Sequence, residues 1–158
     1  MKSTKKTVMS ALFASIIFIL TRFVSVPSFS GVGNVNLGDC AVLLSAWLIS
    51  PKYAFLASGV GSALADLSSA YAIYAPATFI IKGAMALVAS LIHRKTKTLV
   101  SGILAELIMI IGYLSFEGIF ICGFKTALLN IPYNAVQGAI GLASAIILLP
   151  IIKKIIRK

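Results

Sequence analysis

Six runs of apolar residues, joined by short polar connections, dominate this sequence. They cover residues 8–20, 37–49, 53–67, 76–92, 99–116 and 130–152. None alternates polar and apolar residues as a membrane β-strand does, so each run predicts a helix. Since 59% of the 158 residues are hydrophobic and only 11% are charged, against about 25% charged in a soluble domain, we expect an integral membrane protein.

Basic residues decide how often the chain crosses the membrane. The second and third runs are short for membrane spans, which need about 17–25 residues, but a proline at position 51 separates them. If the chain has six spans and a cytoplasmic N-terminus, most of its basic residues lie on the cytoplasmic side. These residues are Lys2, Lys5, Lys6, Lys52, Arg94, Lys95, Lys97, Lys153, Lys154, Arg157 and Lys158. Five spans would put the basic C-terminal tail outside, against the positive-inside tendency.

The fold class that follows is an all-α integral membrane protein. We expect residues 1–158 to form a single domain, one bundle of six transmembrane helices with the N- and C-termini in the cytoplasm. The first run is interpreted as a retained span, because no Ala-x-Ala cleavage pattern follows it. The net charge of +10 lies in clusters beside the apolar runs, which indicates membrane topology and not a nucleic-acid partner.

Charged residues inside the predicted spans are candidates for function. Asp39 and Asp66 lie near the outer ends of the second and third spans, and Lys82 lies deeper in the fourth. An ionised side chain in hydrocarbon costs roughly 2.5–3.5 kcal/mol at a helix centre, so such groups pair or line a wet cavity. For Asp66 and Lys82 the alternatives are a mutual ion pair, anchoring at the interface, or contact with a ligand. For Asp39 the simplest interpretation is the N-cap or a first-turn acid of its helix.

Polar residues also gather on one face of each of the last two spans. Asn130, Tyr133, Asn134 and Gln137 recur at intervals of three and four in the sixth span, so this face is expected to look into the bundle. Glu106 and Tyr113 share a face of the fifth span. Glu106 is predicted near the middle of the membrane. We expect it either to form an interhelical hydrogen bond or to take part in a function such as proton relay.

Several kinds of chemistry have no support in the sequence. There is no G-x-x-x-x-G-K-[ST] loop, so any use of ATP must come from a partner. One histidine, His93, and two distant cysteines, Cys40 and Cys122, do not predict a metal site or a disulfide framework. We expect a protein that is not an enzyme and has neither cofactor nor metal.

Four stretches carry a family resemblance. They are "NLGD" at 36–39, "SPKYAFLASGVGSALADL" at 50–67, "YAPATFIIKG" at 74–83 and "NIPYNAVQGAIG" at 130–141. Together they resemble the S component, the membrane-embedded substrate-binding subunit, of energy-coupling factor (ECF) vitamin transporters. The resemblance covers nearly the whole chain and agrees with the independent count of six helices.

The resemblance implies a subunit of an ABC-type importer in a bacterial plasma membrane. Its partners would be the lipid bilayer, a transmembrane coupling (T) subunit and two cytoplasmic ATPases, with a vitamin or precursor as cargo. It implies docking on the coupling subunit by small residues of the first helix, here Ser10, Ala11, Ala14 and Ser15, and closure of the site by the loop at 23–36.

The expected substrate site combines the resemblance with the polar faces. Its candidate residues are Asp66, Tyr71, Tyr74, Lys82, Glu106, Tyr113, Tyr133, Asn134 and Gln137. Aromatic rings for stacking and amides for orientation suit a small heteroaromatic such as hydroxymethylpyrimidine or pyridoxine. The alternative function is a stand-alone transporter of small solutes that couples to protons or cations through Glu106.

Overall fold

The computed structural model describes residues 3–27 and 34–156. In these residues the long helices are α1 (Ser3–Phe23), α2 (Gly38–Leu48), α3 (Pro51–Leu67), α4 (Ala75–His93), α5 (Thr98–Phe116) and α7 (Ile131–Ile156). Each coincides with one predicted apolar run, so the prediction of six helices is confirmed. The basic residues Lys2, Arg157 and Lys158 of the topology argument lie outside the described residues.

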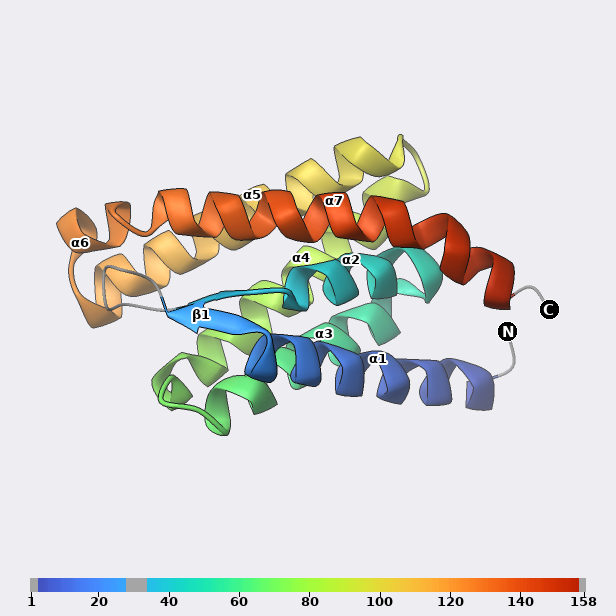
Figure 1. The fold of residues 1–158 in the computed structure, drawn as a ribbon, viewed down its shortest axis with the longest axis horizontal. Coiled ribbons are helices and arrows are strands. Elements are labelled where there is room, and N and C mark those ends of the chain that lie inside the picture. The colour runs from blue at the N-terminus through green and yellow to red at the C-terminus, as the bar shows by residue number, and fades with distance from the viewer. Residues whose placement is uncertain (1–2, 28–33, 157–158) are drawn as a thin grey trace.

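The helices form one elongated bundle in which both ends of the chain lie together. Figure 1 shows the N- and C-termini at one end, and α6, the strand β1 and the α3–α4 connection at the opposite end. Helix α3 packs against α1 and α4, and α5 packs against α4 and α7. An even number of crossings brings the termini to the same end, as the six-span prediction requires.

Helix α2 is the shortest of the six and lies inside the bundle. It packs against α1, α3, α4 and α7, and ten of its residues, from Gly38 to Trp47, are buried. Its 11 residues extend roughly 16 Å, about half the hydrocarbon thickness of a bilayer. Helix α2 is therefore a central support for the outer helices, and its continuous apolar run reflects contact with protein on every side.

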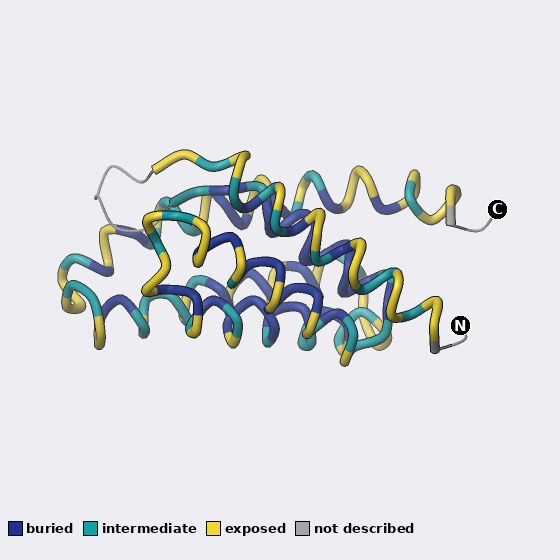
Figure 2. Tube along the Cα trace, turned by 90° about the horizontal axis from the view of Figure 1, so that it is seen from below, coloured by how far each residue is buried: buried dark blue, intermediate teal, exposed yellow. Residues whose placement is uncertain are grey.

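Most of the helices around α2 are long and apolar enough to cross a membrane. Four helical stretches of the described residues meet both conditions, at Thr4–Phe23, Ala72–His93, Thr98–Ile121 and Phe124–Ile155. Large apolar side chains point outward from them, such as Leu12, Ile80 and Ile147, and Figure 2 shows exposed positions alternating with buried ones along the helices. This surface suits contact with lipid tails.

Short connecting structures complete the end opposite the termini. After α1, strand β1 (Ser25–Pro27) pairs antiparallel with β2 (Asn34–Asn36), so the predicted loop at 23–36 contains a small hairpin whose residues 28–33 lie outside the described residues. A 3₁₀ turn, Ala72–Tyr74, precedes α4, and a π-helical turn, Glu117–Ile121, joins α5 to the five-residue α6 (Phe124–Leu128). These elements surround the site described next.

Glycine lets α1 and α3 approach closely. A Cβ atom on Gly61 would lie 2.5 Å from the backbone oxygen of Ala14 and 3.1 Å from Cβ of Ile17. A side chain at position 61 would collide with α1 unless the backbone moved, so the close α1–α3 contact depends on this glycine. Small residues at helix contacts are the usual means of bringing membrane helices together.

Candidate functional site

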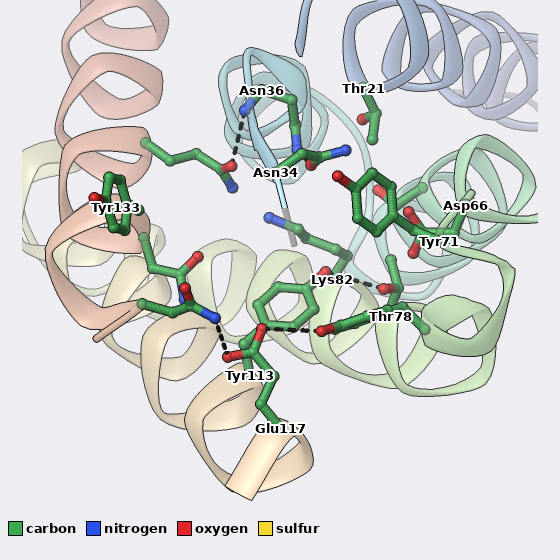
Figure 3. Close-up of a pocket in the computed structure, with 15 residues that line it drawn as sticks. Thr21, Asn34, Asn36, Asp66, Tyr71, Thr78, Lys82, Tyr113, Glu117 and Tyr133 are labelled. Carbon is green, nitrogen blue, oxygen red and sulfur yellow. Dashed lines mark hydrogen bonds between the residues drawn. The ribbon is translucent and has the colours of Figure 1, made fainter. Parts of the chain in front are cut away.

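A polar cavity opens between the helices at the end opposite the termini. The space between its walls, including the part that is open to solvent, is about 530 Å³. Figure 3 shows its walls. The lining residues are Thr21, Asn34, Asn36, Ser62, Asp66, Tyr71, Tyr74, Thr78, Lys82, Tyr113, Glu117, Asn130, Tyr133, Asn134 and Gln137. All predicted substrate-site residues except Glu106 are among them.

Lys82 forms a buried ion pair with a residue other than those expected. Its Nζ donates to Oδ1 of Asp39, and the two residues are 2% and 0% exposed. The sequence alone predicts Asp66 or a ligand as the partner of Lys82. Asp39 does occupy the first turn of α2, as predicted, but the packing of α2 against α4 also carries its carboxylate to the lysine.

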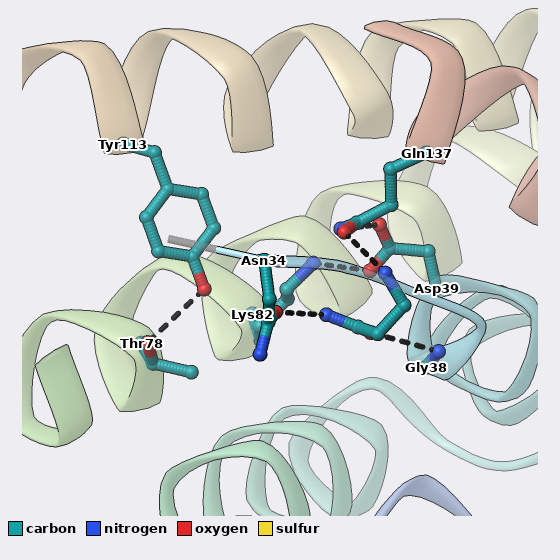
Figure 4. A network of polar contacts seen from close by, with 8 residues as sticks. Asn34, Gly38, Asp39, Thr78, Lys82, Tyr113 and Gln137 are labelled. Atoms are coloured by element: carbon teal, nitrogen blue, oxygen red, sulfur yellow. Dashed lines mark hydrogen bonds and ion pairs between the residues drawn. The ribbon is translucent and has the colours of Figure 1, made fainter. Parts of the chain in front are cut away.

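Gln137 of α7 extends this ion pair to the hairpin. Its Nε2 donates to Oδ2 of Asp39 at 2.6 Å, and its Oε1 accepts the backbone N–H of Asn36 at 2.9 Å. The side-chain oxygen of Asn36 in turn accepts the N–H of Gly38 at 2.9 Å, at the start of α2. Figure 4 shows the resulting network. Four elements, β2, α2, α4 and α7, are thus held together around one buried charge pair.

Aromatic rings form a second wall of the cavity. Tyr74 stands at the centre, with ring centroids 6.2 Å from Tyr71, 6.4 Å from Tyr113 and 5.4 Å from Phe116. The hydroxyl groups of Tyr113 and Thr78 are 3.0 Å apart, and Nζ of Lys82 lies 5.6 Å from the Tyr113 ring centre. Flat apolar faces with fixed polar edges are well suited to hold a planar ring.

Glu117 belongs to the site although the sequence did not single it out. It is 3% exposed, and its carboxylate accepts hydrogen bonds from Nδ2 of Asn130 at 2.8 Å and from the Tyr74 hydroxyl at 3.4 Å. Since the chain has only four acidic residues and Glu117 follows Tyr113 by four positions, the helical face of Tyr113 could have been extended to it. The glycines that follow Glu117 instead suggested a connection.

Glu106 lies outside the cavity. Its side chain is buried at 6% exposure, and neither carboxylate oxygen has a hydrogen-bond partner among the described residues. A Cβ atom on Gly138 would be 2.8 Å from Oε2 of Glu106, so the side chain lies against α7. Tyr113 follows Glu106 by seven positions, which correspond to about 10 Å of helix, and this explains why the same face reaches the cavity only at Tyr113.

The small residues of α1 divide between two surfaces. Ser10 donates to the backbone oxygen of Tyr53 at 3.1 Å, and Ala14 packs against Gly61, so this pair faces α3. Ala11 and Ser15 are exposed on the outside of the bundle. Of the predicted docking residues, the second pair is therefore the more exposed, and Ser10 and Ala14 are half-buried.

The fold and this site define a helical membrane protein with a polar cavity between its helices. The sequence model described as "ECF-type riboflavin transporter, S component" matches residues 1–157. The chain belongs to this family of ECF transporter S components, as its motifs predicted. It is a multi-pass protein of the bacterial plasma membrane and a vitamin-type substrate-binding subunit of a transporter.

Two individual proteins and one solved structure are also similar to this chain. A protein of Lactococcus lactis subsp. cremoris named "Thiamine precursor transporter HmpT" is 27% identical over 154 residues, which are 97% of this chain and 90% of that protein. An uncharacterized protein of Pyrococcus woesei is 33% identical over 101 residues, 61% of this chain and 68% of its own length. The solved structure of the S component of a bacterial ECF transporter shares the fold, with a TM-score of 0.80, 18% identity, and coverage of 99% of this chain and 100% of that chain.

Proposed function

We propose that the cavity binds a small heteroaromatic vitamin precursor, with hydroxymethylpyrimidine or pyridoxine as the best candidates. The observation that carries this proposal is the wall formed by Tyr71, Tyr74 and Tyr113 opposite the amide-bearing face of α7. Rings can stack on the tyrosines while amide groups satisfy the edge of the ligand. The 27% identity to a protein named as a thiamine precursor transporter supports a pyrimidine.

The proposal includes the direction and the partners of transport. The cavity faces the outside of the cell, because the start of α3, which carries Lys52, and the α4–α5 connection, which carries Arg94 and Lys95, lie at the opposite end of the bundle (Figure 1), and basic residues favour the cytoplasmic side. The bound precursor is then passed inward by association with a transmembrane T subunit and two cytoplasmic ATPases. The exposed pair Ala11 and Ser15 on α1 supplies the contact with the T subunit, since small side chains allow helices to pack and slide closely.

The test is ligand-dependent thermal stabilisation of the purified full-length protein against a panel of vitamins and precursors. Submicromolar binding of hydroxymethylpyrimidine or pyridoxine is expected. Asn134→Ala, which removes a lining amide, is expected to weaken binding at least about tenfold, or 1.4 kcal/mol. Exposed Val136 on the same helix provides the control, Val136→Ala, which should bind normally.

The alternative function makes the opposite prediction. A stand-alone transporter would move its solute in vesicles that contain this protein alone, driven by a proton or cation gradient. Glu106, the residue that suggested this alternative, lies outside the cavity and against Gly138. Gradient-driven flux without ATPases, abolished by Glu106→Gln, would replace the S-component proposal.

A further inference from the structure

We propose that the site selects the uncharged form of its ligand over phosphorylated or carboxylated forms, and that Asp39 and Glu117 set this selectivity. This inference rests on the proposed function, because it concerns the ligand of the same cavity. The two carboxylates occupy the two places where the cavity would otherwise stabilise an anion. The carboxylates of Asp39 and Glu117 thus fill the two positions at which the cavity could bind an anionic group of the ligand.

The first place is the ammonium group of Lys82. Lys82 is the only cationic side chain among the described residues that line the cavity, and it is engaged by Asp39. The carboxylate of Asp39 is fully buried and is held on its other oxygen by Gln137 at 2.6 Å. An anionic ligand would have to displace a carboxylate that is anchored from two sides, so Lys82 is not available as an anion site.

The second place is the cluster of donors between α4 and α7. Tyr74 and Asn130 immediately precede these helices, and helix amino ends favour negative charge. The phenol of Tyr74 and the amide of Asn130 both donate to Glu117, whose side chain is 3% exposed. Glu117 therefore occupies the position that the phosphate of a ligand would otherwise take.

A third carboxylate makes an anion still less favourable. Asp66 of α3 also lines the cavity, and Figure 3 shows Asp66 and Glu117 on different sides of the Tyr113 ring. Since Lys82 is balanced by Asp39, the cavity presents two carboxyl groups and no balancing cation from its described lining. A phosphate monoester would add a charge of about −1.5 to −2 at pH 7 close to these groups.

The same arrangement favours a particular kind of neutral ligand. Carboxylate and tyrosine oxygens around the cavity can accept hydrogen bonds from amino and hydroxyl groups. A heterocycle with an amino group or a hydroxymethyl arm provides such donors, and its flat face can rest on the tyrosines. The phosphate ester of the same hydroxymethyl arm would keep the ring but replace a donor with an anion.

The experiment compares three alcohols with their phosphate monoesters, using calorimetry on the purified full-length protein. The pairs are hydroxymethylpyrimidine, pyridoxine and riboflavin, each with its phosphate. For at least one of the three pairs, the natural sequence is expected to bind the alcohol with a dissociation constant about 100-fold lower than that of its phosphate. Equal binding of the two forms would overturn the inference and leave the proposed function standing.

Two variants test the assigned residues. Glu117→Gln keeps the shape and removes the charge, and Asp39→Asn releases Lys82, so each is expected to reduce the preference for the alcohol at least about tenfold. Glu117→Asp, which retains the charge, is the matched control and should keep the preference. An unchanged preference for the alcohol in Glu117→Gln would overturn the role of that carboxylate. If Asp39→Asn does not fold, the result of Glu117→Gln alone tests the inference.

Failure of the proposed function would look different. In that case neither the alcohol nor the phosphate of any pair would bind the natural sequence, which would also overturn the inference that rests on it. Preferential binding of a phosphate would overturn the inference alone.

Discussion

The two halves of this bundle differ in the kinds of side chain that they bury. The half around the cavity buries polar groups, among them Asp39, Lys82, Glu117 and Gln137. The half near the termini buries mainly small residues, alanines and serines such as Ala86, Ala89, Ser90 and Ser101. We call these the cavity half and the termini half.

The polar contacts of the two halves differ in how they are connected. In the termini half they are small separate groups, such as Trp47 Nε1 donating at 3.0 Å to Ser101 Oγ, whose hydroxyl donates to the backbone oxygen of Thr98 at 2.9 Å. In the cavity half one network joins the hairpin to α2, α4 and α7. Small separate groups act as local contacts, whereas a network that spans several elements makes the position of each group depend on the others. The difference suggests that the cavity half is organised for binding and the termini half for packing.

Breaking the central ion pair is expected to have the largest effect. Lys82→Met leaves the Asp39 carboxylate buried without its cation, and removing one partner of such a pair costs about 3–5 kcal/mol. Thermal or denaturant unfolding of the detergent-purified protein should show this loss, together with the loss of ligand binding. The double variant Lys82→Met with Asp39→Leu, which removes both charges, should regain most of the stability. Unfolding of Lys82→Met at the same temperature as the natural sequence would contradict the network.

Separating the hairpin from the network is expected to have an intermediate effect. Gln137→Leu keeps the size of the side chain but leaves the Asn36 N–H and an Asp39 oxygen without this partner, at a cost of about 1–3 kcal/mol. Hydrogen exchange should become faster at β1 and β2. The neighbouring Val136→Ala, at an exposed position, serves as the control. Unchanged exchange in Gln137→Leu would show that the hairpin is held by other contacts.

A change in the termini half should affect stability without affecting binding. Trp47→Phe removes the hydrogen bond to Ser101, so the free energy of unfolding should fall by about 1 kcal/mol. Ser101→Ala combined with Trp47→Phe should cost little more than either change alone, because both remove the same bond. The ligand dissociation constant should change by less than about threefold, which corresponds to less than about 1 kcal/mol. A larger change would mean that the two halves are coupled.

The smallest effect on the isolated protein is expected on the outer face of α1. Ala11 is exposed, so Ala11→Trp should change the free energy of unfolding by no more than about 0.5 kcal/mol and leave ligand binding unaltered. Uptake by cells that express the full transporter should nevertheless fall, because the bulky ring prevents close packing with the T subunit. Leu12→Trp, also at an exposed site, is the control. Normal uptake with Ala11→Trp would remove this face from the docking proposal.

Much of the cavity could be predicted because periodicity is a local property. The three- and four-residue spacing of Tyr133, Asn134 and Gln137 identifies their common face whatever the rest of the chain does. All three line the cavity, as do Asp66 and Lys82. Glu106 shares the face of Tyr113 but lies too deep, since periodicity gives the direction of a side chain and not where the space between helices ends.

The sequence by itself determined the membrane class, the six helices, the family and most of the cavity-lining side chains. Hydrophobic runs, basic clusters and helical spacing are local patterns, and each has a direct physical meaning in a bilayer. The tertiary structure alone decided that Lys82 pairs with Asp39, 43 positions away, and that Gln137 reaches the hairpin across 101 positions. Such partners depend on how α2, α4 and α7 approach one another, and no local pattern in the chain specifies that approach.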